Sequence, residues 1–297
     1  MKAISVVDLR KSYGGSPAVN GISFDVDEGS FFAFLGPNGA GKSTTISILC
    51  SSLSKDSGEV LIFGRNPEES RKDIGIVFQD NRLDSRLTIR ENLMVRGSLY
   101  GYGKDELTER VDRALDRTDI RDIADRPYSD LSGGQKRRAE IARGIIHDPK
   151  ILMLDEPTSG LDPQSRRLIW NNIQMLREEG MTVFLTTHYM EEAADADDIV
   201  IINKGEIVAH GTPAALKERY SSDYLEIVPK DEERLISLLR ESDIEFIAHS
   251  GLLRVPLKNT VDAIPIIEHI RNEIDSFEVR TGTLDDAFLA IIGGPEQ

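Results

Sequence analysis

A glycine-rich segment after an apolar run constrains the fold of this chain more than any other feature. The apolar run is Phe31–Leu35, and the segment is Gly36-Pro37-Asn38-Gly39-Ala40-Gly41-Lys42-Ser43, which fits the pattern G-x-x-x-x-G-K-[S/T]. Glycines let backbone N–H groups turn inward around phosphate oxygens, and the helix expected next adds the positive end of its dipole. The segment therefore predicts a nucleoside triphosphate site at the end of a buried strand.

Two side chains of this segment carry chemistry of their own. We expect Lys42 to reach the β- and γ-phosphates and the Ser43 hydroxyl to hold Mg²⁺. The nucleotide contacts predicted here are Gly36, Asn38, Gly39, Ala40, Gly41, Lys42, Ser43 and Thr44.

A second apolar run, Ile151–Leu154, ends in two acids, Asp155 and Glu156. Carboxylates at the C-terminal end of a parallel strand lie on the ligand-binding edge of the sheet. Asp155 suits the Mg²⁺ shell, either directly or through water. Glu156, one residue further, is placed to polarise a water molecule for in-line attack on the γ-phosphate.

The segment Leu131-Ser132-Gly133-Gly134-Gln135 begins a predicted helix and has two interpretations. It is either a second phosphate-binding helix terminus or an ordinary helix start capped by serine. Two charged runs are interpreted as solvated helix faces, not as nucleic-acid or metal sites. The basic run is Lys136, Arg137, Arg138 and Arg143, and the acidic run is Glu191, Glu192, Asp195, Asp197 and Asp198.

Strands and helices alternate along residues 1–220, which predicts an α/β domain with a mostly parallel sheet and a helical insert at about 88–145. Residues 222–297 form a second pattern, strand-helix-strand-strand-helix-strand, which predicts a small ferredoxin-like α+β domain. A last amphipathic helix carries Leu284, Phe288 and Ile291. These side chains either dock elsewhere or close the core of this small domain.

Charge and hydropathy narrow the classes of function. Lys and Arg number 36 against 51 Asp and Glu, a net charge of -15, which opposes non-specific binding to nucleic acid. The small domain holds 7 basic and 16 acidic residues. No apolar run of about 18 residues occurs, and the N-terminus lacks the apolar region of a signal peptide. We therefore expect a cytoplasmic protein without its own membrane span.

The motifs, in their order, resemble those of the nucleotide-binding subunit of ATP-binding cassette (ABC) transporters. The resemblance covers about residues 2–220, and it implies the P-loop ATPase cassette fold and ATP hydrolysis. It is carried by Tyr13 in KSYGG, the P-loop at 36–43, Gln79 in FQD, LSGGQ at 131–135, ILMLDE at 151–156, SGLD at 159–162 and His188 in TTHYM.

The resemblance also implies roles that the residues alone do not give. Tyr13 would stack on adenine, Gln79 would sense Mg²⁺ and the attacking water, and His188 would bond the γ-phosphate. In this family two cassettes pack head to tail, so Ser132 and Gly134 complete the partner's ATP site and Asp162 couples the two sites. The implied partners are a second copy or a paralogous ATPase, and a transmembrane permease at the cytoplasmic face of the membrane.

The phrases around the motifs are similar to the daunorubicin-resistance and multidrug exporter type of ATPase, although many of its members have methionine where this chain has Gln135. Alternatives stay open: an importer ATPase, an ABC ATPase of translation or DNA repair, and a cassette that binds ATP without hydrolysis. The last would lack Glu156 or His188, and both residues are present. Translation factors usually carry two cassettes and repair ATPases a long coiled-coil insert, and neither feature occurs here.

Overall fold

The structure, a computed structural model, describes residues 1–249 and 251–293. Contacts divide the chain into one compact unit at residues 1–212, here called the cassette, and a second unit that begins at Pro213. The change of pattern in the sequence predicted this division at 220–222. The difference lies in helix α7 (Pro213–Tyr220), which packs against α10 (Leu284–Gly293) and so belongs with the second unit.

A six-stranded sheet forms the centre of the cassette, in the order β5-β6-β7-β3-β8-β9. Neighbouring strands are parallel except for β8 and β9, which confirms the mostly parallel sheet. Strands β3, β6 and β7 are buried along their whole length, which the continuous apolar runs in β3 and β6 predict. The bounds are β3 Phe31–Leu35, β5 Ile74–Val77, β6 Ile151–Asp155, β7 Thr182–Thr187, β8 Asp198–Asn203 and β9 Glu206–Gly211.

A three-stranded antiparallel sheet, in the order β2-β1-β4, shares a core with the central sheet. Phe24 of β2 stacks on Phe32 of β3 with ring centroids 5.4 Å apart, and Phe32 stacks on Phe184 of β7 at 5.3 Å. This aromatic contact joins the two sheets through buried apolar area. The bounds are β1 Lys2–Tyr13, β2 Ser16–Asp27 and β4 Ser57–Ile62.

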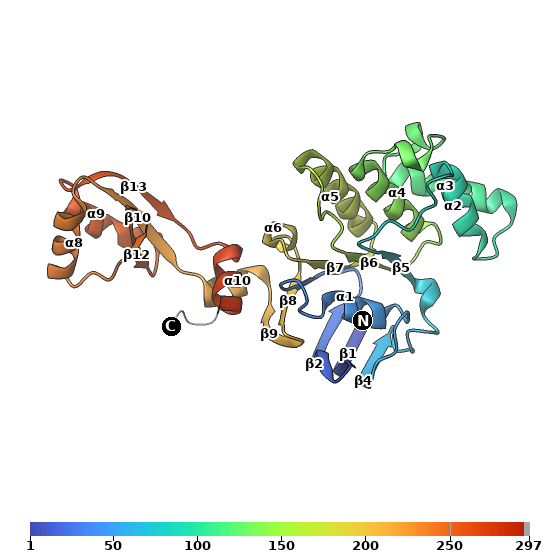
Figure 1. The fold of residues 1–297 in the computed structure, drawn as a ribbon, viewed down its shortest axis with the longest axis horizontal. Helices are drawn as coiled ribbons and strands as arrows, with labels where there is room; N and C mark the ends of the chain where they lie inside the picture. Colours follow the sequence, from blue (N-terminus) through green and yellow to red (C-terminus); the bar gives the residue numbers. More distant parts are fainter. Residues whose placement is uncertain (250, 294–297) are drawn as a thin grey trace. The chain divides into compact units, whose positions relative to one another are not determined.

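Helices cover both faces of the central sheet. Figure 1 shows α4 and α5 on one face and α1 on the other, the side of the three-stranded sheet. The helical insert begins at α2, where Thr88 and Glu91 form a reciprocal capping box. The bounds are α1 Lys42–Leu49, α2 Ile89–Ser98, α3 Lys104–Arg117, α4 Gly133–Ile145, α5 Pro163–Glu178 and α6 Met190–Ala193, with short 3₁₀ turns at 71–73, 121–123 and 128–130.

The second unit contains an antiparallel sheet in the order β11-β12-β10-β13. Numbered along this unit, the order is 2-3-1-4, which is the strand order of a ferredoxin-like fold. Leu225, Leu235 and Leu253 lie in its separate core, between the sheet and helices α8 and α9. The bounds are β10 Asp223–Pro229, α8 Glu232–Glu241, β11 Ile247–His249, β12 Leu252–Leu257, α9 Ala263–Ile270 and β13 Ile274–Arg280, with a 3₁₀ turn at 260–262.

The last helix, α10, packs against α7 within the second unit. Leu284 and Ala287 are buried, whereas Phe288 and Ile291 are half-buried and Leu289 is exposed. Helix α7 lies outside the 222–297 bounds of the predicted domain, and the core around Leu225 contains no described residue of α10. The contact therefore agrees with the interpretation in which this helix docks outside the core of the small domain.

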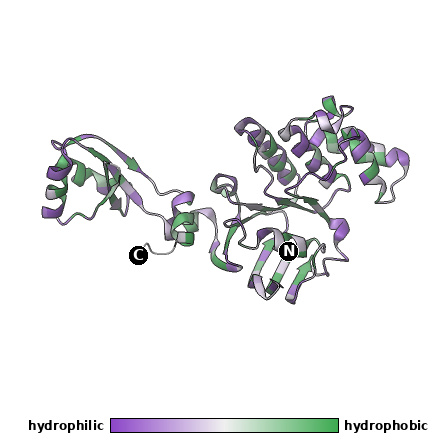
Figure 2. Cartoon of the chain, in the orientation of Figure 1, coloured by the Kyte–Doolittle hydropathy of each residue, from purple (hydrophilic) through white to green (hydrophobic). Residues whose placement is uncertain are grey.

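Hydrophobic residues follow the strands of both units, while the helices are hydrophobic on part of their surface (Figure 2). Apolar stretches are short in this arrangement. Within residues 1–249 and 251–293, no helix has the length and apolar character needed to cross a membrane.

Candidate functional site

The glycine-rich loop lies between β3 and α1, and neighbouring backbone leaves no room for a side chain at two of its glycines. A Cβ at Gly36 would lie 2.3 Å from the carbonyl oxygen of Ile202, and one at Gly41 would lie 2.4 Å from that of Ala18. Gly41 also has φ of 113°, a conformation that side chains disfavour. The loop is therefore held in one shape by its neighbours, with the N-terminus of α1 at its end.

Lys42 is buried beneath this loop, with only 4% of its surface exposed. Its Nζ donates hydrogen bonds to the carbonyl oxygens of Gly36, at 2.7 Å, and Pro37, at 3.1 Å. The same Nζ lies 3.3 Å from Oε1 of Glu156. The ammonium group is thus fixed inside the loop, next to the acid that the sequence analysis selected.

The ends of β6 and β7 bring the two acids to the loop. Oδ1 of Asp155 accepts hydrogen bonds from Ser43 Oγ, at 3.2 Å, and from Thr186 Oγ1, at 2.6 Å. Glu156 has a positive φ of 44°, and its backbone N–H donates to the carbonyl oxygen of Thr186 at 3.0 Å. Pairing with β7 therefore fixes the bend that turns Glu156 toward Lys42.

His188 completes this group from the segment after β7. Its Nδ1 lies 3.4 Å from Oε2 of Glu156, and its ring packs on Tyr189 with centroids 4.0 Å apart. One oxygen of Glu156 therefore faces a lysine and the other faces a histidine. The fold therefore places Glu156 between the two side chains that the sequence motifs singled out beside it.

A cavity of about 270 Å³ opens over these groups. It is lined by Ala18, Asn38, Gly39, Gly41, Lys42, Ser43, Thr44, Gln79 and Glu156. Gln79 and Ser43 also line a neighbouring groove of about 630 Å³, together with Asp155, Phe78, Arg82 and Arg96. The structure thus brings Lys42, Ser43, Gln79 and Glu156 to one opening, with Asp155 in the adjoining groove. Three predicted residues, Gly36, Ala40 and His188, do not line this cavity.

The LSGGQ segment lies at a different opening. Ser132 caps α4 by accepting a hydrogen bond from the Gln135 N–H, and Gln135 Oε1 accepts one from the Ser132 N–H. Ser132, Gly134 and Gln135 line a cavity of about 190 Å³ with Arg138, Gln164, Ser165 and Leu168. Gly133 adjoins it at the first position of α4. Among the residues that the structure describes, none lines both this cavity and the P-loop cavity.

Two further predicted residues lie outside the P-loop cavity. Asp162 caps α5 and accepts a hydrogen bond from the Ser165 N–H at 2.9 Å, and hydrogen bonds from Ser165 keep the pKa of Asp162 below its usual value. Tyr13 ends β1 with half of its surface exposed, and Lys11 Nζ lies 5.9 Å from its ring. Neither side chain lines the cavity that holds Lys42.

Two residues assigned to solvated faces are buried beside the site, so those interpretations were wrong for them. Arg137 is 5% exposed and donates to carbonyl oxygens at the ends of β5 and β6. Glu192 is 6% exposed and accepts hydrogen bonds from Thr158 and Thr187. Burial raises the pKa of Glu192 from its usual value to about 7. Thr186, which holds Asp155, was also missed.

Helical periodicity was the available signal for Arg137. It shares one face of α4 with Gly134, Ile141 and Gly144, and that face is buried. Glu192 had a weaker signal, because it lies between Met190 and Ala193, both buried, in a helix of four residues. Apart from helical periodicity and apolar neighbours, nothing in the sequence indicates that a charged residue in a polar run is buried.

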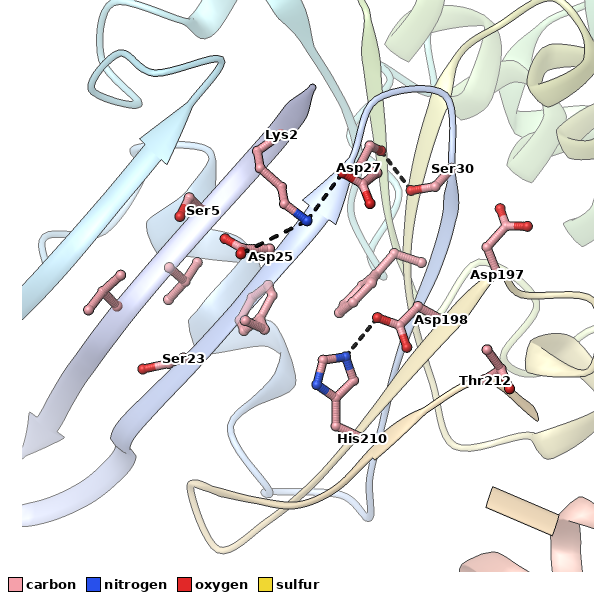
Figure 3. A pocket seen from close by; sticks show the side chains of 14 residues that line it. Lys2, Ser5, Ser23, Asp25, Asp27, Ser30, Asp197, Asp198, His210 and Thr212 are labelled. Carbon is pink, nitrogen blue, oxygen red and sulfur yellow. Dashed lines mark hydrogen bonds and ion pairs between the residues drawn. The ribbon is translucent and has the colours of Figure 1, made fainter. Parts of the chain in front are cut away.

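Another cavity, of about 630 Å³, lies between β1, β2, β8 and β9 and is drawn in Figure 3. Its charged side chains pair with one another: Lys2 with Asp27 at 3.2 Å, and His210 with Asp198 at 2.7 Å. None of the predicted phosphate or metal residues lines this cavity. Its composition therefore does not make it a competing nucleotide site.

Comparisons with known proteins agree with this geometry. The family model described as "ABC transporter" matches residues 19–159. The daunorubicin/doxorubicin resistance ATP-binding protein DrrA of Streptomyces peucetius is 37% identical over 99% of this chain and 93% of its own length. The Nod factor export ATP-binding protein I of Rhizobium sp. (strain N33) is 40% identical over 80% of each chain.

Solved structures give the same result for the fold. The cbiO1 protein of Clostridium perfringens, described as part of an ABC transporter complex, has a TM-score of 0.68 and 30% identity over 81% of this chain and 95% of its own. A bacterial ABC transporter cassette solved as a dimer has a TM-score of 0.65 and 29% identity over 70% of this chain and 98% of its own. By sequence and by fold, the chain belongs to the ATP-binding subunits of ABC transporters.

Proposed function

We propose that this chain hydrolyses ATP at the P-loop cavity in order to power export through a separate transmembrane permease. The observation that carries the proposal is the position of Glu156, whose two carboxylate oxygens lie 3.3 Å from Lys42 Nζ and 3.4 Å from His188 Nδ1. A carboxylate between a phosphate-binding lysine and a histidine is well placed to activate a water molecule for attack on a γ-phosphate.

The loop would bind the phosphates of ATP through its backbone N–H groups and the N-terminus of α1. Lys42 would exchange its contact with Glu156 for one with the β- and γ-phosphates. Tyr13 would stack on adenine from the exposed end of β1. ATP binding would therefore change the contacts of Lys42 and would recruit Tyr13 from outside the cavity.

The residues also fit Mg²⁺. In the described ranges no three His, Cys, Asp or Glu side chains form a metal-binding group, but Mg²⁺ usually takes one or two carboxylates with substrate phosphates. Ser43 Oγ and Asp155 Oδ1 are oxygen ligands 3.2 Å apart, and Gln79 lines the same opening. Bound Mg²⁺ would neutralise charge that develops on the phosphates.

Hydrolysis would then rest on residues of this chain. Glu156 would accept a proton from the attacking water, while Thr186 holds the backbone that aims it. His188 would donate a hydrogen bond to the γ-phosphate, and Gln79 would orient the water. Proton transfer by a positioned side chain contributes typically 10²–10⁴-fold to a rate.

A second chain, identical or paralogous, would complete each site. The P-loop and LSGGQ segments line separate cavities, so one cassette offers half a site at each. In a head-to-tail pair, Ser132, Gly133, Gly134 and Gln135 of one chain would contact the γ-phosphate bound by the other, and Asp162 would lie between the two sites. The dimeric form of one solved relative supports this arrangement.

The names of the relatives support export, and they do not favour the importer or non-transport alternatives. DrrA is a resistance protein, and the Nod factor protein is an export protein.

We propose that the groove beside Gln79 faces the permease and that the cassette works at the cytoplasmic face of the membrane. Isolation of the chain from detergent-treated membranes would test this, because a bound subunit with several membrane spans is expected.

Substitution Glu156→Gln tests the hydrolytic role. It removes the base and the negative charge that faces the γ-phosphate but keeps the shape of the side chain. We expect turnover to fall at least about 100-fold and ATP with Mg²⁺ to hold a dimer that gel filtration detects. Turnover equal to that of the wild type would contradict the role of Glu156.

A further inference from the structure

Arg137 lies in the second turn of α4 and makes five hydrogen bonds, all to backbone carbonyl oxygens. Its Nε donates to Pro157 at 2.6 Å, and its Nη2 donates to Asp155 and Glu156 at 2.9 Å each. Its Nη1 donates to Phe78 and, at 3.5 Å, to Gln79. The guanidinium therefore joins the segment after β5 to the segment after β6.

The five acceptors match the five N–H groups that a guanidinium carries in a fixed plane. Burial lowers the pKa of Arg137 to about 10, so the group stays charged at neutral pH. Its cost of burial is offset by the carbonyl dipoles and by the charge of Glu140 one turn further along α4. A lysine has one ammonium group and would not satisfy two strand ends together.

Glu140 also holds the segment after β5, here called the Gln79 loop. Its Oε1 accepts hydrogen bonds from the N–H groups of Arg82, at 2.5 Å, and Leu83, at 2.9 Å, and its Oε2 pairs with Arg143. Glu140 is fully buried. Helix α4 thus holds the Gln79 loop at two points and the Glu156 backbone at one.

We infer that Arg137 is a positioning residue for hydrolysis, which fixes the backbone of Glu156 and Gln79 and ties it to the helix that begins with the LSGGQ segment. In a head-to-tail pair, the start of α4 would contact the ATP bound by the other chain. Arg137 would couple the position of α4 to the position of Glu156 in its own chain. The inference rests on the proposed role of Glu156.

Substitution Arg137→Lys tests it, because lysine keeps the charge and removes the planar fork. We expect kcat to fall about 30-fold, while the Kd for ADP and the KM for ATP stay within about threefold, since Arg137 does not line the nucleotide cavity. The matched control is Arg90→Lys, a guanidinium of α2 that pairs with Asp112 and Asp125 away from the site. Its kcat should equal that of the wild type.

The Glu156→Gln background separates positioning from a general effect on the fold. There the base is already absent and only the positioning of Gln79 can still be lost, so Arg137→Lys should slow single turnover by clearly less than 30-fold, at most about fivefold. A full 30-fold loss in both backgrounds would overturn the inference, as would unchanged kcat, or a raised KM with unchanged kcat.

Folding is checked by thermal melting of each variant. Where Arg137→Lys does not fold, Arg137→Gln, whose amide still donates two hydrogen bonds, takes its place in the same comparison. Failure of both to fold would overturn the inference in favour of a purely structural role. Wild-type turnover in Glu156→Gln alone would instead refute the proposed function, so the two failures are distinguishable.

Discussion

At the scale of single residues, Glu156 and the phosphates of ATP compete for one ammonium group. Lys42 Nζ lies 3.3 Å from Glu156 Oε1, and a γ-phosphate that binds Lys42 must replace this contact. Removal of the carboxylate charge therefore slows hydrolysis and strengthens ATP binding. Both effects favour the ATP-bound state, so the Glu156→Gln variant should accumulate with ATP bound.

Lys42→Ala and Ser132→Arg should fail in different ways. The first removes a phosphate contact of the same chain, so we expect nucleotide binding to weaken at least about tenfold. The second blocks the cavity at the start of α4, so the chain should still bind ATP but lose turnover. Equilibrium binding and ATPase assays on each variant distinguish the two. Loss of ATP binding by monomeric Ser132→Arg would contradict the shared site.

Glu192 should make stability depend on pH. Its pKa is about 7 in the folded chain, above the usual value near 4.5, because burial penalises the charged form. A raised acid pKa contributes stability that is complete below pH 4.5 and is lost as the pH rises through 7. The loss is up to about 3 kcal/mol.

Urea unfolding of the wild type and of Glu192→Gln between pH 5.5 and 8 measures this difference. The wild type should lose stability relative to the variant as the pH rises across this range. A constant difference between the two proteins would show that Glu192 does not titrate there.

At the scale of elements, the turn from β3 into α1 depends on close approach of two backbones. Gly36→Ala would place a Cβ 2.3 Å from the carbonyl oxygen of Ile202, a main-chain atom of β8. We expect a loss of at least about 2 kcal/mol in the free energy of unfolding, together with weaker ATP binding. Denaturant unfolding and nucleotide titration measure both.

Gly103→Ala is the control for this substitution. Gly103 precedes α3, its φ is -65°, and no atom lies within 4 Å of the added Cβ. Its cost should stay below about 1 kcal/mol. Equal losses for the two variants would mean that the approach of β8 does not restrict Gly36.

The elements that could be predicted are those whose pattern is local. Phe31–Leu35 and Ile151–Leu154 are continuous apolar runs, and a glycine loop or an acid pair marks where each ends. Arg137 was missed because its partners lie far along the chain, and Glu192 because it stands in an acidic run on a helix of only four residues. Phe78 and Asp155 accept from Arg137 across 59 and 18 residues, and a polar run does not indicate such carbonyls. The nucleotide contacts could be predicted because they follow from residues that are close together in the sequence. The hydrogen bonds that hold the backbone of Glu156 and Gln79 join distant segments and could not be predicted.

At the scale of the whole molecule, the phosphate and metal residues all lie in the cassette. The second unit, from Pro213 onward, carries 9 basic and 17 acidic residues and no glycine-rich phosphate loop. Its sheet has a core of its own, with Leu225 and Leu253 fully buried. We propose that it regulates or steadies the dimer and supplies no catalytic group.

A chain that ends at Thr212 should therefore fold and bind ATP with the wild-type Kd to within about threefold. The comparison is a chain that ends at Tyr220, which keeps α7 but removes α10 and so exposes Leu216, now 2% exposed. Both should bind ATP, and the longer chain should aggregate more readily in light scattering. Loss of nucleotide binding by a folded chain ending at Thr212 would place part of the active site in the second unit.

The pairing of α7 with α10 also sets an order of events during synthesis. Helix α7 ends at Tyr220 and α10 begins at Leu284, and a ribosome adds roughly 5–20 residues per second from the N-terminus. For several seconds a nascent chain therefore holds a finished cassette and an α7 without its packing partner. The cassette is therefore complete before synthesis of the second unit ends, and α7, which follows the cassette along the chain, is the segment where a nascent chain exposes Leu216 to chaperones.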